Sequence, residues 1–406
     1  MSPLQTVGIG GFQVLNLNNK SMFMVRNNAG AVVNDTEYFN CLMGVSSGEV
    51  TDVDRAYFVM PAAGTITNFR VKYDAALTGA MAMEYYIVVN GVSTLVATVN
   101  SSGSTKFAAL NIVLAKGDLV CYKYIPRSSP TSTHHWISCV IESATDMMIM
   151  GNNKALHNTS IRYFTPQGSC NALQATNSAA RVYFPTSGTL KNIYVRLSQP
   201  PGVGNTWQIK IIDQAFATKA TINISDLNTT GEAVITYNLV QGNAYYISID
   251  PTVGTPTPCY FSYSSVFQPL IQGEYPLMYT EYANVLDSVN PHYNYLIGPK
   301  FYLIASSTPT PTERRMPLLN GYVLKKFYVR SENAPGAGKS WTYNVGVGYP
   351  STPSGLSVAI VDTNNNNVDN TNEYTTVEGE EYLLKLTPSG SPATTNKVWA
   401  SMVLAN

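Results

Sequence analysis

Short runs of aromatic, β-branched and other apolar residues recur along the chain, and turn residues interrupt them every 8–12 positions or so. No long segment repeats with the 3.6-residue period of a helix, so the pattern predicts strands and turns. One example is 382–386, Tyr-Leu-Leu-Lys-Leu, which follows a glycine turn and runs to Pro388. Proline has no N–H to donate to a sheet, so we expect it to end the strand.

Four landmarks recur three times in the same order, over about 85 residues per copy, which is the signature of an internal repeat. The spacing from the turn glycine to the proline of the third landmark is the same in all copies: Gly117 to Pro126, Gly242 to Pro251, Gly379 to Pro388. In the closing strand, Ser138, Ser262 and Ser401 are expected to be equivalent. The landmarks are an opening strand (61–71, 185–195, 317–329), a central strand (84–91, 206–213, 340–348), a glycine–proline strand (116–126, 241–251, 378–388) and a closing strand (136–141, 260–265, 399–404).

This repeat predicts an all-β protein of three tandem antiparallel β-sandwich or jelly-roll-like domains, with eight or so strands each. The Tyr-rich stretch 273–295 matches no repeated strand pattern, so we expect it to be an interface loop, with glycan stacking as the alternative. The Pro- and Thr-rich join 306–317 is expected to be an extended loop. The predicted divisions are an N-terminal anchoring arm (1–20) and β-sandwich repeats 1 (21–145), 2 (146–268) and 3 (269–406).

Charged residues make up 12% of the chain and the formal net charge is zero, against roughly 25% charged residues in ordinary soluble domains. A nucleic-acid-binding surface needs clustered Lys and Arg, so we expect no nucleic-acid partner. No run of 18 apolar residues occurs, and the first twenty residues lack a basic region and an apolar core, so we expect neither a membrane partner nor a secretion signal. The five cysteines show no C-x-x-C spacing, which favours buried free thiols over disulfides or zinc.

The stretch Ala334-Pro-Gly-Ala-Gly-Lys-Ser-Trp341 ends like a nucleotide-binding loop. The motif fails at both ends, because Asn333 stands where the first glycine belongs and a strand-like run follows Ser340. The second copy, 200–207, keeps Pro-Gly-x-Gly and the tryptophan but has Asn205 in place of the lysine. The pattern therefore favours a structural turn and no nucleotide cofactor.

Candidate metal-binding and catalytic residues also depart from the patterns that such sites require. In 362–373, acidic and amide residues stand at positions 1, 3, 5 and 12 of a calcium loop, but position 6 is Asn367 where glycine belongs, so we expect a hairpin loop and no metal. Adjacent His134 and His135 would point to opposite faces of a strand, and we expect solvated loop histidines. No pair of carboxylates converges as a glycosidase requires; the candidates are Asp52 with Asp54 and Glu380 with Glu381, both interpreted as turn residues. We therefore predict no catalytic, cofactor-binding or metal-binding residue.

Segments 335–348 and 377–404 resemble β-repeat modules of bacteriophage and other viral surface proteins. Those modules carry P-G-x-G-x-[ST]-[WYF], then N-G, G-D-x-V and P-S-G-x-P; here N-G survives only as Asn90-Gly91 and G-D only as Gly117-Asp118. The resemblance covers most of copies two and three and the second half of copy one. It implies a β-sandwich module of capsid decoration, head-fibre or tail-fibre type, and it brings no catalytic residue.

Together these observations predict a non-enzymatic virion structural protein, a minor capsid, decoration or fibre component. Its expected partners are other virion proteins, namely major capsid or fibre neighbours, and further copies of itself, with a surface glycan as an additional partner. The alternative is a glycan- or receptor-binding adhesin on a virion or cell surface.

Overall fold

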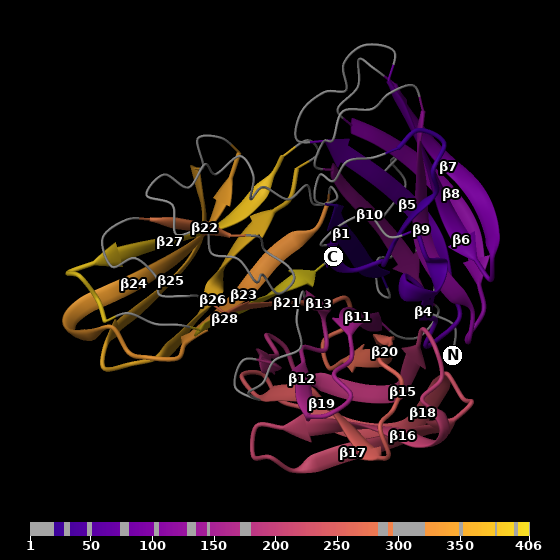
Figure 1. Ribbon diagram of the computed structural model, residues 1–406. Coiled ribbons are helices and arrows are strands. Elements are labelled where there is room, and N and C mark those ends of the chain that lie inside the picture. The colour runs from indigo at the N-terminus through magenta and orange to yellow at the C-terminus, as the bar shows by residue number, and fades with distance from the viewer. Residues whose placement is uncertain are drawn as a thin grey trace, which may run out of the picture.

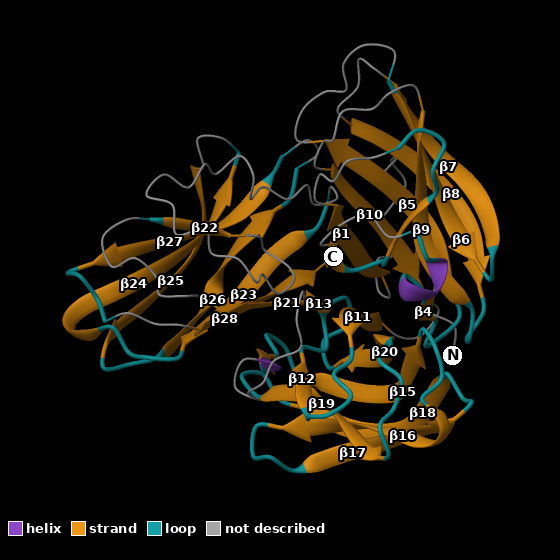
Figure 2. Cartoon of the chain, in the orientation of Figure 1, coloured by secondary structure: helices purple, strands orange, loops and turns teal. Residues whose placement is uncertain are grey.

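A computed structural model describes residues 20–27, 33–46, 51–73, 81–100, 105–127, 135–143, 147–170, 180–282, 291–294, 321–348, 352–377, 380–393 and 397–405. Strands make up nearly all of the regular structure in these ranges, as Figure 2 shows, and a 3₁₀ turn η1 spans Val53–Arg55. The prediction of an all-β sandwich fold is confirmed.

The first module, β1 to β10, consists of two sheets. The first sheet contains, in spatial order, β3 (Gly44–Ser46), β1 (Lys20–Asn27), β10 (His135–Glu142), β5 (Gly64–Tyr73) and β8 (Thr105–Leu114). The second contains β2 (Tyr38–Asn40), β9 (Leu119–Arg127), β6 (Ala82–Val89) and β7 (Val92–Asn100), and β4 (Phe58–Val59) also pairs with β9. Short β3 pairs with β1 in parallel, and the other pairings are antiparallel.

The second module, β11 to β20, repeats this arrangement. Its first sheet contains β13 (Gly168–Cys170), β11 (Met147–Ala155), β20 (Tyr260–Pro269), β15 (Gly188–Leu197) and β18 (Thr230–Leu239). Its second contains β12 (Arg162–Phe164), β19 (Ala244–Val253), β16 (Gly202–Asp213) and β17 (Thr218–Asp226), and β14 (Val182–Tyr183) pairs with β19.

The third module, β21 to β28, has two sheets of four strands. The first contains β21 (Tyr275–Tyr282), β28 (Lys397–Ala405), β23 (Val323–Ser331) and β26 (Asn366–Thr375). The second contains β22 (His292–Asn294), β27 (Tyr382–Ser389), β24 (Gly336–Val347) and β25 (Thr352–Asp362).

All three modules have the strand order of a jelly roll. If the short strands β3, β4, β13 and β14 are set aside, the first of the eight strands of a module pairs with the eighth, the eighth with the third and the third with the sixth. In the other sheet the second pairs with the seventh, the seventh with the fourth and the fourth with the fifth. Figure 1 shows the modules grouped around the centre of the molecule, where β1, β11 and β21 lie.

The eighth strand of each module is buried along its length. The described side chains of β10, β20 and β28 are almost all inaccessible, and Ile137, Phe267 and Val403 are each 0% exposed. A strand at the surface alternates between buried and exposed residues, whereas a strand covered on both faces reads as a continuous apolar run. One face of these strands packs inside its own sandwich, and the other packs against neighbouring modules. A single hydrophobic core cluster consequently contains residues of all three modules.

Trp136, Trp207 and Trp341 lie in this cluster, and Trp399 lies in a smaller cluster with Tyr183 and Tyr328. Trp207 and Trp341 are 0% exposed on the equivalent strands β16 and β24, and Trp136 and Trp399 are 3% and 4% exposed.

The structure corrects two details of the repeat. The stretch 273–295 does belong to the repeated pattern, because β21 pairs with β28 and β22 with β27, in the places of the first and second strands of the other modules. Its aromatic residues hid the match because the first strands of the other modules are rich in methionine. The register also shows that Ser264, opposite Tyr194, is the counterpart of Ser138 opposite Arg70 and of Ser401 opposite Tyr328; the alignment of Ser262 was wrong by two residues.

The divisions between repeats stay predictions. The expected boundary at 145/146 falls between β10 and β11, and that at 268/269 falls at the end of β20. Apart from Lys20, the anchoring arm 1–20 lies outside the described residues, as does the join 306–317. Among the described residues, no helix is long and apolar enough to cross a membrane.

Gly188 opens the third strand of the second module at a place where no side chain fits. A Cβ there would lie 2.5 Å from the backbone oxygen of Gln268 and 2.5 Å from the ring of Phe267. We expect Gly188→Ala to lower the free energy of unfolding by about 1–3 kcal/mol through overpacking. Thr189→Ala, on the adjacent half-exposed position, should change it by less than about 0.5 kcal/mol. Urea denaturation of both variants measures the difference, and equal midpoints would contradict this packing.

Candidate functional site

The turn that resembles a nucleotide-binding loop holds a carboxylate of the protein itself. Gly336 and Gly338 have φ of 99° and 70°, and the Gly338 N–H donates to Asp362 Oδ1 at 2.7 Å. The second module has the same turn, in which the Gly204 N–H donates to Asp226 Oδ1 at 2.8 Å. Backbone N–H groups in such a turn attract anions, and here the anion is already present.

The two glycines lie at the start of a strand, β24 in the third module and β16 in the second. The register with the next strand shifts there, between Gly336 and Ser340 and between Gly202 and Thr206. A phosphate loop needs the N-terminus of a helix at this place. The stretch 334–341 therefore has a structural role, as interpreted, but it is the bulged start of a strand and not a separate turn.

The calcium-like stretch 362–373 is a tight hairpin. Asp362 ends β25 and β26 begins at Asn366, so the turn itself is short. Glu373, the expected last ligand, lies on β26 opposite Lys325. The Asp362 carboxylate is bound to the Gly338 N–H. Among the described residues, no group of three or more His, Cys, Asp or Glu side chains is placed to hold a metal ion.

Asp369 in this hairpin is a buried structural carboxylate, 7% exposed. It accepts hydrogen bonds from the backbone N–H groups of Ser357, Thr371 and Asn372 at 3.0–3.2 Å and from the side chains of Thr371 and Asn372. Burial alone would raise its pKa, but the hydrogen bonds from Asn372, Ser357 and Thr371 outweigh burial and lower the pKa to about 2. Hydrogen-bond donors surround this group, whereas a calcium site would need oxygen acceptors.

The histidines divide between surface and core. His157 Nδ1 lies within hydrogen-bond distance of the hydroxyls of Thr159 and Ser160 in an exposed turn, and His134 lies outside the described residues. The expectation of a solvated His135 is wrong. This residue is 1% exposed on β10, 5.2 Å from the ring of Tyr73 and 5.2 Å from that of Tyr124.

The members of the two acidic pairs have separate partners in the structure. Asp52 caps η1 by accepting a hydrogen bond from the Asp54 N–H, and Asp54 pairs with Arg196 of the second module. Glu380 Oε2 accepts hydrogen bonds from two tyrosine hydroxyls, and Glu381 pairs with Lys72 of the first module. The expectation that these acids are merely solvated turn residues misses the two ion pairs between modules.

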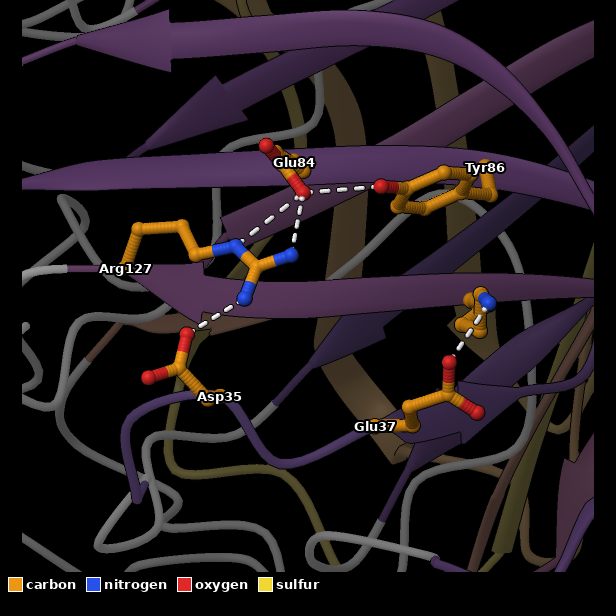
Figure 3. A network of polar contacts seen from close by, with 6 residues as sticks. Asp35, Glu37, Glu84, Tyr86 and Arg127 are labelled. Carbon is orange, nitrogen blue, oxygen red and sulfur yellow. Dashed lines mark hydrogen bonds and ion pairs between the residues drawn. The ribbon is translucent and has the colours of Figure 1, made fainter.

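A charged network covers part of the outer face of the first module (Figure 3). Arg127 donates two hydrogen bonds to Glu84 Oε2, at 3.0 and 3.1 Å, and contacts Asp35. Tyr86 donates a third bond to Glu84 Oε2 at 2.7 Å. The Tyr86 hydroxyl, ahead of Arg127, lowers the pKa of Glu84, so this acid stays ionised.

The same network continues with Lys123, which pairs with Glu37 at 2.8 Å. Lys123 also lies 4.6 Å from the centre of the Tyr86 ring. The Asp35 N–H donates to the Pro126 oxygen at 2.9 Å. Each acid of this network is paired with a cation, so the arrangement holds the segment that precedes β2 against the sheet.

Other charged groups form contacts between modules. At the junction of the first and second modules, Arg196 on β15 donates to the backbone oxygen of Asp54 at 2.6 Å and to its carboxylate at 2.5 Å. The guanidinium of Arg55 lies 3.7 Å from the centre of the Tyr260 ring. The Ser264 hydroxyl donates to the Val59 oxygen at 2.6 Å. The turn η1 and strand β4 therefore dock on the second module.

The junction of the second and third modules contains a buried carboxylate. Glu274 is 1% exposed and contacts Lys326 at 2.6 Å, Lys325 at 3.4 Å and the hydroxyl of Thr186. Lys326 lies at the bulge of β23, with φ of 52°. One acid thus ties the end of the second module to the third strand of the next.

Aromatic and amide side chains complete the same junction. Tyr183 on β14 packs against Tyr328 and Trp399, with ring centres 5.7 Å apart in both cases, and Arg330 lies over the Tyr183 ring at 5.2 Å. Gln167 is 1% exposed, donates to the Pro276 oxygen at 3.1 Å and accepts from the Met278 N–H at 2.7 Å.

The first and third modules also meet. Lys72 on β5 pairs with Glu381 at 2.7 Å, and the two side chains are only 17% and 13% exposed. Tyr322 of the third module is buried; burial first, and then the charge of Glu142 in the first module, raise its pKa. The three modules therefore form a closed ring.

The three junctions share one kind of contact, made by a cation on the third strand, which the sequence analysis did not predict. Lys72, Arg196 and Arg330 occupy the same position of the third strand, opposite Trp136, Ser262 and Trp399 of the eighth strand. Each cation contacts the preceding module of the ring: Glu381, Asp54 and the Tyr183 ring respectively. The signal was present, because a Lys or Arg follows a valine at this landmark in every copy (71–72, 195–196, 329–330).

Four cysteines, Cys41, Cys121, Cys139 and Cys259, are free and buried, as predicted. Burial raises the pKa of Cys41, Cys139 and Cys259 to about 12, so they remain protonated and unreactive at neutral pH.

Comparisons with known proteins assign no family. No protein-family model matches the chain, and no curated protein matches it. Among solved structures, an FMN-binding beta-glucuronidase from Facaelibacterium prausnitzii L2-6 aligns at 10% identity and a TM-score of 0.15, over 65% of this chain and 44% of that enzyme. The chain thus spans less than half the length of that enzyme, and similarity of this degree says nothing about its fold or activity.

The Gly338 turn should depend on its glycine and not on the adjacent lysine. Gly338→Val forces a β-branched residue to φ of 70°, which should lower the free energy of unfolding by about 1–3 kcal/mol. Lys339→Ala should leave the melting temperature unchanged, because Asn205 fills this place in the second module. Thermal unfolding checks both, and tight ATP binding in a calorimetric titration would contradict the turn interpretation.

Asp369 should make the free energy of unfolding depend on pH in the acid range. Its folded pKa is about 2, below the value near 3.9 of an unfolded Asp. The stabilisation is therefore fully present above about pH 4 and is lost as the pH falls toward 2, and it amounts to roughly 2 kcal/mol. Asp369→Asn should lose it at neutral pH and unfold with a flatter dependence between pH 4 and 2. Identical pH profiles of variant and wild type would contradict this role.

Glu274→Gln should destabilise the second junction. Removing one partner of a buried ion pair leaves the other charge uncompensated, and because both lysines are partly exposed we expect a loss of about 2 kcal/mol. The control is Glu232→Gln, whose exposed pair with Lys116 at 3.9 Å should contribute less than about 0.5 kcal/mol. Chemical denaturation compares the two, and similar losses would show that Glu274 is not the centre of the junction.

Proposed function

We propose that this chain is a non-enzymatic structural protein of a virion, a minor capsid, decoration or fibre component that assembles through its β-sandwich modules. The observation that carries the proposal is the use of its charged and aromatic groups. Asp54, Arg196, Glu274, Lys72 and Glu381 all serve contacts between modules. Ionisable side chains that stabilise contacts between modules are expected in a protein that functions by assembly.

The jelly-roll strand order supports the same proposal. Jelly rolls are the usual architecture of viral capsid domains, and they also occur in lectins. Fold alone does not fix function; the low charge, the buried thiols and the resemblance of 335–348 and 377–404 to viral surface modules add further support.

The tip of the second module offers a contact surface for a virion neighbour. Val203, Leu227 and Val253 are 78%, 71% and 52% exposed there. The register brings them together, because Gly202 lies opposite Asp226 and Thr206 lies opposite Val253. At the equivalent positions the third module has the small or polar residues Ala337, Thr363 and Ser389. The second module thus differs from the third in this apolar tip, as expected for a surface that a neighbouring virion protein covers.

The test is where the protein resides and in how many copies. Particles purified from a producing culture should contain it at a fixed ratio to the major capsid protein, measured by quantitative mass spectrometry and immunogold labelling. A protein that stays in the soluble host fraction would contradict the proposal. Binding of the purified chain to a glycan array, without incorporation into particles, would favour the adhesin alternative.

A tip variant sharpens this test. The triple substitution Val203→Ala, Leu227→Thr and Val253→Ser gives the second module the tip residues of the third. We expect incorporation into particles to fall about tenfold or more, the factor for losing roughly 1.4 kcal/mol of binding, while the melting temperature stays unchanged. The control is Val234→Thr, a substitution at a position 77% exposed on β18, away from the tip. Normal incorporation of the tip variant would place the contact elsewhere.

A further inference from the structure

One junction of the ring joins two modules that are not consecutive in the sequence. The first and second modules are joined by a short connection, from Glu142 to Met147, and the second and third by one from Pro269 to Tyr275. The first and third modules meet through residues that lie far apart in the sequence, Lys72 and Glu381. The ring therefore closes through a contact that no short connection spans.

This closing contact is also the sparsest of the three in the described part of the chain. Arg196, Arg55 and Ser264 join the first two modules, and Glu274, Gln167 and an aromatic cluster join the second and third. The third module meets the first through the Lys72–Glu381 ion pair and the approach of Tyr322 to Glu142 and of Tyr275 to Cys139, and no pair of described strands between these two modules packs as closely as those at the other junctions.

The closing contact is nevertheless specific. Lys72 is the counterpart of Arg196 and Arg330, so the contact is of the same kind as at the other two junctions. Its two side chains are largely shielded from solvent, which makes a wrong charge at either position costly. The interface is heterologous, because different surfaces of the first and third modules meet.

From these observations we propose that the closing interface is exchangeable between copies, so that the third module of one chain binds the first module of another. Within one chain, the linkage gives the two modules a high effective concentration, which keeps the dilute protein a closed monomer. Where copies are crowded, the ring opens and the same contact joins neighbours head to tail, as in domain swapping. The partner is a second copy of this chain, and the inference does not depend on the virion proposal.

Mixing two charge-reversed variants tests the proposal. Lys72→Glu places two acids at the closing contact, and Glu381→Lys places two bases there, so each variant alone should close poorly. In a head-to-tail pair made of one copy of each variant, both contacts join opposite charges. We expect the mixture to contain at least about ten times more dimer than either variant alone, a factor that corresponds to roughly 1.4 kcal/mol. Native mass spectrometry with one variant isotopically labelled identifies the mixed dimer.

Two controls separate exchange from other causes. The mixture of Lys72→Ala and Glu381→Ala has no complementary charges and should show no gain in mixed dimer. The double variant that carries both Lys72→Glu and Glu381→Lys restores an opposite pair within one chain and should be as monomeric as wild type. A mixture of the reversed variants that remains monomeric at every concentration would overturn the proposal.

A covalent readout avoids charge reversal in case those variants fail to fold. Lys72→Cys with Glu381→Cys in one chain places two reactive thiols at the closing contact, and the four described native thiols are buried. Cross-linking with a short bis-maleimide should give an internally linked monomer in dilute solution, and a ladder of linked dimers and longer chains that grows with protein concentration. An internally linked monomer as the sole product up to millimolar concentration would show that the ring does not exchange.

Discussion

The architecture depends on strands that are buried on both faces. β10, β20 and β28 each pack into their own sandwich with one face and against neighbouring modules with the other. Side chains alternate between the two faces of a strand, so each of these strands needs two complementary apolar surfaces. A single module removed from the ring would expose one of them to water. This requirement makes the three jelly rolls one cooperative unit, although each has a complete strand order of its own.

Small polar residues allow the modules to approach at these faces. Ser138, Ser264 and Ser401 are 1–2% exposed on the eighth strands, opposite Arg70, Tyr194 and Tyr328. Residues paired across neighbouring strands lie on the same face, and Tyr328 packs against Tyr183 of the second module, so the serines belong to the seam between modules. Charge is then placed at the rim of each seam, where one cation of the third strand contacts the preceding module. The chain has few charged residues, and many of them lie at the rims of these seams.

The sequence predicts the repeated strands well and the contacts between modules poorly. The main strands recur in three copies and the Pro-Gly-x-Gly motif in two, and all follow local rules, so the copies reinforce one another. The partners of Lys72, Arg196 and Arg330 obey no such rule, because Glu381, Asp54 and Tyr183 come from three different kinds of segment. His135 was misplaced for a related reason. A histidine beside a Ser- and Pro-rich run reads as a loop residue, and only the fold shows the tyrosine rings that enclose it.

A ring of three similar modules in one chain differs from a homotrimer in one physical respect. In a homotrimer, symmetry forces every interface and every exposed tip to be identical. Here the shared strand order preserves the ring while the described surfaces of the modules differ: a charged network around Arg127 in the first, an apolar tip around Val203 in the second, an Asn-rich hairpin around Asp369 in the third. Three modules of one strand order can therefore carry three different surfaces, which the symmetry of a homotrimer would not allow.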